Sequence, residues 1–226
     1  EILPSVGQLN YELEAETGVN YEAGFRGAVA GNRLSYDVNL FYFNLKNAIT
    51  IRRDAFGAEY FVNSGITRQA GAEAYLKYRT LTAPAGFLKI FDTWASYTLN
   101  NFKYKEFQKG EDDFSGNMLP GVPRHGLSAG IDIGTKTGSS LHIIWSYTDA
   151  MMLNDANTDK AAAYQLLDIR VGQAIKFNEK LKATLFFAGN NLGNGTGHDL
   201  NAFGLRYYNA SPGINFTGGI SVNFNY

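Results

Sequence analysis

Apolar and polar residues alternate along the last stretch of the chain. Phe216, Ile220, Val222, Phe224 and Tyr226 fall at even positions, and the odd positions after Phe216 carry small or polar residues. Successive side chains of a β-strand point to opposite faces, so this stretch predicts a strand whose apolar face ends in aromatic residues. Such an exposed edge invites aggregation in a soluble protein. In an outer-membrane barrel, by contrast, such an apolar face contacts lipid, and aromatic residues lie at the membrane interface.

The same alternation recurs along the chain, and no segment of useful length has the period of a helix. The first two alternating segments are joined by Gly31-Asn32-Arg33, which is short enough for an antiparallel hairpin. We therefore expect about nine strands of the ~10-residue kind that cross a membrane obliquely. They occupy residues 19–29, 34–42, 70–78, 91–99, 127–133, 141–147, 167–175, 183–187 and 216–226.

The connections between these segments alternate in length. Outer-membrane barrels have short periplasmic turns and long outer loops, and the alternation fits that asymmetry. A count of nine strands that starts on the long-loop side ends on the short-turn side, which predicts a periplasmic C-terminus. The short turns are 31–33, 81–86, 134–139 and 177–180, and the long loops are 52–59, 102–123, 149–163 and 193–213.

The face opposite the apolar one is charged but not uniformly polar. The charges occur on nearly every strand rather than at one focus, which favours a solvated lumen over a catalytic cluster of acids and bases. Apolar residues also fall on this face, and a barrel that contacts a folded plug explains them better than an empty pore does. The charged residues include Glu22, Arg26, Asp37, Glu73, Lys77, Asp92, Asp168 and Arg170, and the apolar ones are Ile90, Trp94, Ile144, Leu166 and Phe186.

Composition limits the remaining classes. The chain has 226 residues, 45% of them hydrophobic and 14% aromatic, with a formal net charge of -1 and no cysteine. There is thus no basic field for nucleic acid, no disulfide and no thiol-ligated metal. No stretch approaches the ~20 apolar residues of a membrane helix. Glu1-Ile-Leu-Pro-Ser lacks the features of a signal peptide, and we expect the chain to be a piece of a longer protein.

Short sequence motifs along the chain resemble those in the C-terminal part of the TonB-dependent outer-membrane receptors, and they occur in that family's order and spacing. Gly193 stands where the family's "N-N-L-F" turn usually has Phe, and the aromatic-ended last strand resembles the family's closing signature. The motifs are Tyr21-Glu-Ala-Gly-Phe, Asn39-Leu-Phe-Tyr-Phe, Asn47-Ala-Ile, Asn63-Ser-Gly, Gly71-Ala-Glu-Ala, Ala95-Ser-Tyr-Thr, Leu119-Pro-Gly-Val-Pro-Arg-His, Leu167-Asp-Ile-Arg, Asn190-Asn-Leu-Gly-Asn and Ser211-Pro-Gly-Ile-Asn-Phe.

The resemblance implies an all-β fold, an antiparallel transmembrane β-barrel of about 22 strands whose lumen is filled by an N-terminal plug. Residues 1–226 would form one partial domain supplying about nine C-terminal strands, without the plug. The implied function is uptake of a siderophore or other iron complex across the bacterial outer membrane, with no enzymatic activity and no cofactor. The implied partners are the plug, the remaining strands, the TonB complex, outer-membrane lipid and lipopolysaccharide, and an iron chelate.

Basic and aromatic residues in the predicted outer loops are the candidate ligand contacts. Arg52, Arg53 and Tyr60 flank one loop, and Lys103 and Tyr104 begin another. Arginines and aromatic rings suit an anionic, aromatic chelate, and they equally suit lipopolysaccharide or an aromatic girdle.

Metal-binding patterns are weak in this sequence. His125, His142 and His198 lack the spacing of a metal site, and we predict none. Asp155-Ala-Asn-Thr-Asp159 begins like a calcium loop but has Lys160 in place of the glycine, so a solvated loop is the better interpretation.

Two other classes stay open at this point. A small outer-membrane barrel of other function would need an even strand count and, as an enzyme, a focused catalytic group. A soluble all-β binding module would bury its apolar face against a second sheet.

Overall fold

A computed structural model of the chain describes residues 2–3, 8–9, 13–53, 59–63, 65–80, 86–109, 111–193, 195, 198–202, 205–209 and 212–224. Side chains are described for residues 13–49, 61–63, 65–80, 86–109, 111–193, 195 and 212–224. Among the described residues, no helix is long and apolar enough to cross a membrane.

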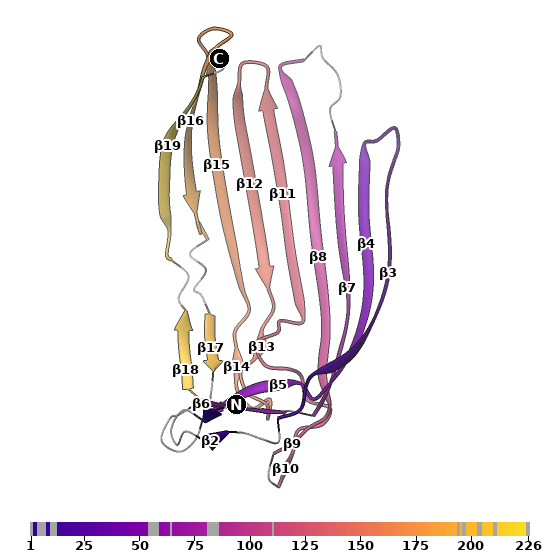
Figure 1. Cartoon of the computed structure of the whole chain (residues 1–226). Coiled ribbons are helices and arrows are strands. Elements are labelled where there is room, and N and C mark those ends of the chain that lie inside the picture. The colour runs from indigo at the N-terminus through magenta and orange to yellow at the C-terminus, as the bar shows by residue number, and fades with distance from the viewer. Residues whose placement is uncertain are drawn as a thin grey trace.

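The alternating segments form one antiparallel sheet of nine long strands (Figure 1). The sheet order is β19-β16-β15-β12-β11-β8-β7-β4-β3, so each long strand pairs with the next long strand along the chain. The predicted all-β class and antiparallel wall are confirmed. The strands are β3 (Thr17–Val29), β4 (Leu34–Lys46), β7 (Ile66–Arg79), β8 (Leu88–Glu106), β11 (His125–Thr135), β12 (Ser139–Thr148), β15 (Tyr164–Lys176), β16 (Leu181–Asn190) and β19 (Asn215–Phe224).

Within the described residues, β3 and β19 each pair along one edge only, so the nine strands form an open wall. An unpaired edge leaves backbone N–H and C=O groups without partners, which hydrocarbon does not tolerate. In a closed barrel both of these edges would be paired. The barrel of about 22 strands stays a prediction.

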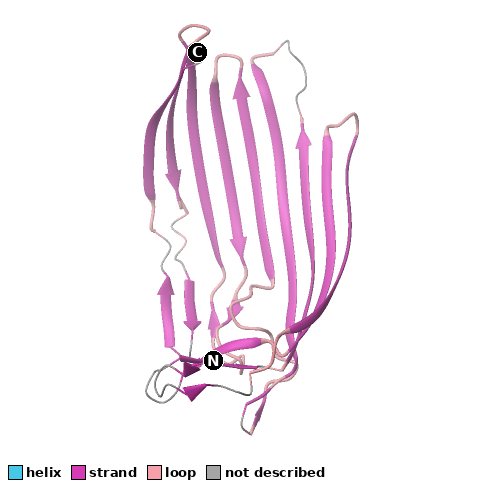
Figure 2. Cartoon of the chain, in the orientation of Figure 1, coloured by secondary structure: helices cyan, strands magenta, loops and turns pink. Residues whose placement is uncertain are grey.

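The two ends of the wall differ, as the alternation of loop lengths predicted. Short turns and the C-terminal end of β19 lie at one end, and small hairpins gather at the other (Figures 1 and 2). The long connections, which we expected to be plain loops, thus contain short paired strands. These strands are β5 (Ile49–Arg53) with β6 (Glu59–Asn63), β9 (Gln108–Lys109) with β10 (Asp112–Asp113), β13 (Met151–Met152) with β14 (Lys160–Ala161), and β17 (His198–Ala202) with β18 (Leu205–Asn209). A further pair, β1 (Ile2–Leu3) with β2 (Gln8–Leu9), lies near the N-terminus. The predicted turn residues 81–85 and Tyr226 lie outside the described residues.

The apolar face of the wall is exposed. Phe25, Phe187 and Ile220 are 64%, 53% and 69% exposed, and in the described part of the chain no second sheet is stacked on them. A β-sandwich would bury this face, so the arrangement disfavours the soluble binding module. Buried side chains instead gather at the hairpin end, where Tyr104, Phe107, Met151, Leu153 and Ala161 lie.

Candidate functional site

A row of charged side chains crosses the inner face, which is opposite the exposed apolar one. The register pairs Arg79 with Asp92, Asp92 with Asp132, Asp132 with His142, and His142 with Arg170, on strands β7, β8, β11, β12 and β15. Residues paired across antiparallel strands point to the same face. Neighbouring strands are ~4.8 Å apart, so these residues extend over about 20 Å of wall. We call them the inner charged row.

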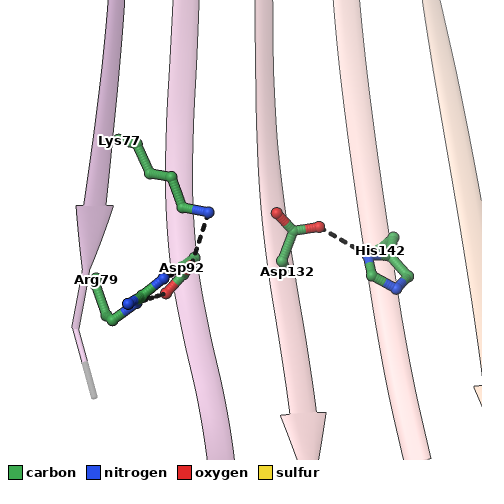
Figure 3. A network of polar contacts seen from close by, with 5 residues as sticks. All are labelled: Lys77, Arg79, Asp92, Asp132 and His142. Carbon is green, nitrogen blue, oxygen red and sulfur yellow. Dashed lines mark hydrogen bonds and ion pairs between the residues drawn. The ribbon is translucent and has the colours of Figure 1, made fainter. Parts of the chain in front are cut away.

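Asp92 is the buried member of the inner charged row. Its side chain is 4% exposed, and its carboxylate lies 2.9 Å from Lys77 Nζ and 3.2 Å from Arg79 Nε (Figure 3). A buried carboxylate needs such partners to offset the loss of water. The two cations are 34% and 52% exposed, so solvent screens each pair to about 1 kcal/mol. The group therefore stabilises the wall locally, and the charge of the buried carboxylate is compensated by two cations.

Asp132 and His142 form the next contact along the row. His142 Nδ1 lies 2.7 Å from Asp132 Oδ1 (Figure 3). An ionised carboxylate only accepts hydrogen bonds, so Nδ1 carries the proton and donates it. The imidazole is thereby held in one orientation between Asp132 and Arg170.

Arg170 lies against an aromatic ring rather than a carboxylate. Its guanidinium carbon is 4.1 Å from the centre of the Phe186 ring. A guanidinium on an aromatic face gains a cation–π attraction and keeps its N–H groups available at its edge. Beside it is a hollow of about 570 Å³ on the inner face, lined by Asp132, Ser140, His142, Asp168, Arg170 and Phe186, among others.

Aromatic side chains on the inner face lie over glycines of the neighbouring strand. Trp94 pairs with Gly130 and Phe186 pairs with Gly219. A Cβ added to Gly219 would lie 2.8 Å from the Phe186 ring, and one added to Gly130 would collide with the Trp94 ring. The glycines thus let these rings lie flat along the wall, as aromatic side chains do when they cover strand glycines. This arrangement explains two of the apolar residues on the predicted lumen face.

A second pocket, of about 400 Å³, lies at the hairpin end. Glu16, Ile49, Phe102, Tyr104, Leu119 and Asp155 are among its lining residues. The Tyr104 hydroxyl donates to Asp155 Oδ1 at 2.7 Å, and the backbone N–H of Ile49 donates to Glu16 Oε1 at 2.7 Å. Both carboxylates therefore already hold the pocket's own walls together.

Asn157 joins the two long connections that follow β8 and β12. Its Oδ1 accepts from the N–H of Met118 at 2.7 Å, and its Nδ2 donates to the carbonyls of Met118 at 2.9 Å and Asn154 at 3.1 Å. The Asn157 backbone has φ 56°, in the left-handed region that Asn tolerates better than most residues. The side-chain amide thus pairs with another segment's backbone as a strand residue would.

This hydrogen-bonded turn occupies the segment that began like a calcium loop. Asp155 accepts from Tyr104, and Asp159 Oδ1 accepts from the N–H of Lys160 at 3.1 Å. In the described part of the chain, no group of three His, Asp or Glu residues could hold a metal ion. His125 lies 2.8 Å from the Tyr97 hydroxyl, and the His198 side chain lies outside the described residues.

The five predicted ligand contacts fall into different environments. Tyr104 is 6% exposed and lines the hairpin-end pocket, whereas the alternation of β8 places Lys103 on the opposite face of the strand. In the β5–β6 hairpin Arg52 pairs with Tyr60, next to Arg53, but the side chains of these three residues lie outside the described set. The ligand role of all five stays a prediction. The sequence did not single out Asp132, Arg79 or Asn157, because their roles depend on strand register and on contacts between loops.

Residues 3–192 match the family described as TonB dependent receptor-like, beta-barrel. The match covers most of the chain, and the chain belongs to this family of receptors and transporters. Barrels of this family lie in the outer membrane.

Solved structures with the same fold include several metal transporters. The ferric citrate transporter FecA in the unliganded form has a TM-score of 0.71 and 19% identity, over 91% of this chain and 31% of its own. The ferric-catecholate import receptor Fiu from E. coli K12 has a TM-score of 0.61 and 18% identity, over 95% and 28%. The copper transporter OprC has a TM-score of 0.66 and 16% identity, over 94% and 32%. The chain thus spans less than a third of each structure.

Proposed function

We propose that this chain is part of the barrel wall of a TonB-dependent receptor that takes up a siderophore or other iron complex across the bacterial outer membrane. This proposal rests mainly on the single nine-stranded wall, which is apolar on one face and charged on the other, in a chain that belongs to this family. Lipid would contact the apolar face, and a plug and the remaining strands would complete the receptor. The hairpin end would face outward and the C-terminus the periplasm.

An iron complex is favoured over other cargo by the names of similar structures. Ferric citrate, ferric catecholate and ferric yersiniabactin name the cargo of three of them. Such chelates are frequently anionic and aromatic, which suits arginine and aromatic side chains. Copper names the cargo of another, so copper is the alternative that an experiment must separate.

The hairpin end offers a place for this ligand. The pocket there is lined by Ile49, the first residue of β5, and by Tyr104. Arg52 is three residues further along β5, a distance of about 10 Å in a strand. Arg52, Arg53 and Tyr60 would bind the anionic groups and rings of the chelate above the pocket, and Tyr104 would line its floor. Lys103, on the opposite face of β8, would contact lipopolysaccharide or the outer rim.

Binding to the full-length receptor tests the ligand site. We expect the double substitution Arg52→Ala with Arg53→Ala to weaken binding of a ferric catecholate about tenfold or more, because two charge-assisted contacts are lost. Arg68→Ala is the matched control. Arg68 pairs with Lys103 on the apolar face at the same end of the wall, and its removal should leave affinity unchanged. Unchanged affinity in the double variant would remove the two arginines from the site.

Uptake by cells tests the function as a whole. A strain with this receptor as its sole iron-chelate receptor should accumulate radioactive iron from the chelate and lose that uptake when TonB is deleted. Accumulation of copper but not chelated iron under the same conditions would overturn the iron assignment.

A further inference from the structure

Arg170 stands out among the basic side chains of the inner charged row, because Lys77 and Arg79 share Asp92 and His142 binds Asp132. Within the residues that the structure describes, the Arg170 guanidinium makes no ion pair, and its one ring contact is with Phe186. It is an exposed cation held in a fixed place at the edge of a hollow.

The stacking under Arg170 runs through two strands. Phe186 of β16 lies over Gly219 of β19, and Arg170 of β15 lies over Phe186. A guanidinium pinned by a ring loses little further rotamer freedom when it binds a planar anion in its fork of N–H donors. His142 pairs with Arg170 across the strands, and because Asp132 holds its Nδ1, the imidazole forms a fixed side of the space beside the guanidinium.

We propose that Arg170, with His142 beside it, is the docking point for a carboxylate side chain of the domain that fills the lumen. This inference rests on the proposed function, which supplies a lumen domain. A carboxylate matches the forked guanidinium in shape and charge. The neighbouring acids would not compete, because Asp132 is engaged by His142 and Asp168 Oδ1 accepts from the N–H of Asn191 at 2.8 Å.

The depth of the site suits a partner that fills the lumen. On β15 Arg170 lies six residues from Tyr164, on the hairpin-end side, and six residues from Lys176, on the short-turn side. At ~3.3 Å per residue Arg170 is thus about 20 Å from either end of its strand. The chain also spans less than a third of the structures it matches, and in the proposed receptor part of the remaining length would form the domain at this depth.

The experiment measures how readily the lumen domain leaves the wall in the purified full-length receptor without any iron complex. The present chain has no cysteine, so a single cysteine introduced into the lumen domain reports exposure through its rate of reaction with a maleimide. Arg170→Gln should raise this rate about tenfold, the size expected for a lost charge-assisted hydrogen bond. Arg170→Lys and Phe186→Leu should raise it less, because each keeps the charge but loses either the fork or the ring beneath it.

Lys182→Gln is the matched control. Lys182 is another exposed cation on the inner face of β16, outside the hollow, and its removal should leave the labelling rate unchanged. Thermal unfolding of the barrel, followed by circular dichroism, checks that each variant is folded. Equal rates in Arg170→Gln and wild type, or equal effects of Arg170→Gln and Lys182→Gln, would overturn the proposal.

Two further measurements separate the partners. Arg170→Cys combined with a cysteine at each Asp or Glu position of the lumen domain should give a disulfide with one of them under mild oxidation. If Arg170→Gln instead weakens ferric-catecholate binding and leaves the labelling rate unchanged, the site binds ligand and the inference is wrong. A receptor that does not transport iron but shows the expected labelling would contradict the proposed cargo and leave this inference standing.

Discussion

The substitution Asn157→Asp should loosen the contact between the two long connections at the hairpin end. Both the oxygen and the nitrogen of the Asn157 side-chain amide form hydrogen bonds. Oδ1 accepts from the N–H of Met118, and Nδ2 donates to the carbonyls of Met118 and Asn154. A carboxylate keeps the first of these contacts and turns the other two into repulsions between oxygens. Aspartate also tolerates the positive φ of 56°, so backbone strain contributes little to the difference.

The magnitude follows from the two donated hydrogen bonds. Each neutral hydrogen bond contributes about 1 kcal/mol net, so losing both costs about 2 kcal/mol of local stability. That corresponds to roughly a 30-fold increase in the population of the opened connection. The barrel itself should unfold as before, because the nine-stranded pairing does not involve Asn157.

Hydrogen exchange of the full-length receptor in detergent measures this opening. The N–H groups of Met118 and Gly121 bond to Asn157 Oδ1 and to the carbonyl of Met152, and both should exchange about 30-fold faster. Asn178→Asp is the matched control. In the described part of the chain Asn178 uses only its acceptor oxygen, which binds the N–H groups of Lys180 and Leu181 and is retained by aspartate. Unaltered exchange at Met118 and Gly121 in Asn157→Asp would refute the interpretation that this side chain joins the two connections.

Other substitutions probe the wall and the β9–β10 hairpin. Gly130→Ala should destabilise the barrel by about 1–3 kcal/mol in urea unfolding, because the new Cβ collides with Trp94. Gly126→Ala on the same strand should be nearly neutral, since its Cβ would lie 3.9 Å from the nearest side-chain atom; equal effects would contradict the flat-ring arrangement. Hydrogen bonds from the hydroxyl and amide of Ser115 hold the pKa of Asp113 below its ordinary value of 3.8. Their stabilisation of the hairpin is therefore present at neutral pH and is lost as the pH falls through the lowered pKa. Ser115→Ala should return the pKa toward 3.8 in a carbon-13 NMR titration, and an unchanged pKa would exclude this cause.

The two-residue period of the sequence was enough to predict all nine long strands and their faces. It predicted their ends less well, and β8 shows why: the alternation suggested residues 91–99, whereas the strand runs from Leu88 to Glu106. Phe102 and Tyr104 are aromatic but lie on the inner face, so the apolar-outward rule fails there while the backbone pairing with β7 continues. The alternation of apolar and polar residues indicates which face of the strand a residue occupies. Where the inner face is also apolar, the alternation disappears and no longer indicates where the strand ends.

The candidate sites depend on information that period does not carry. Lys77, Asp92 and Arg170 could be assigned to the inner face from parity, but which residues pair depends on register. Register places Arg79 and Lys77 beside the buried Asp92 and leaves Arg170 on Phe186. The small hairpins in the long connections were missed for a related reason. Several of these strands are only two residues long, and no hydrophobic period can be read over that length.

The inner wall has two properties that would suit the lumen domain of the proposed receptor. The rings of Trp94 and Phe186 lie flat over Gly130 and Gly219, so these two large apolar groups do not project far from the wall. In the inner charged row, Lys77 and Arg79 are paired with Asp92, and His142 is paired with Asp132, which limits the attraction of these side chains for a partner. If a lumen domain contacts these flat rings and paired charges only weakly, a cation without an ion pair, such as Arg170, would determine both where the domain docks and how easily it leaves.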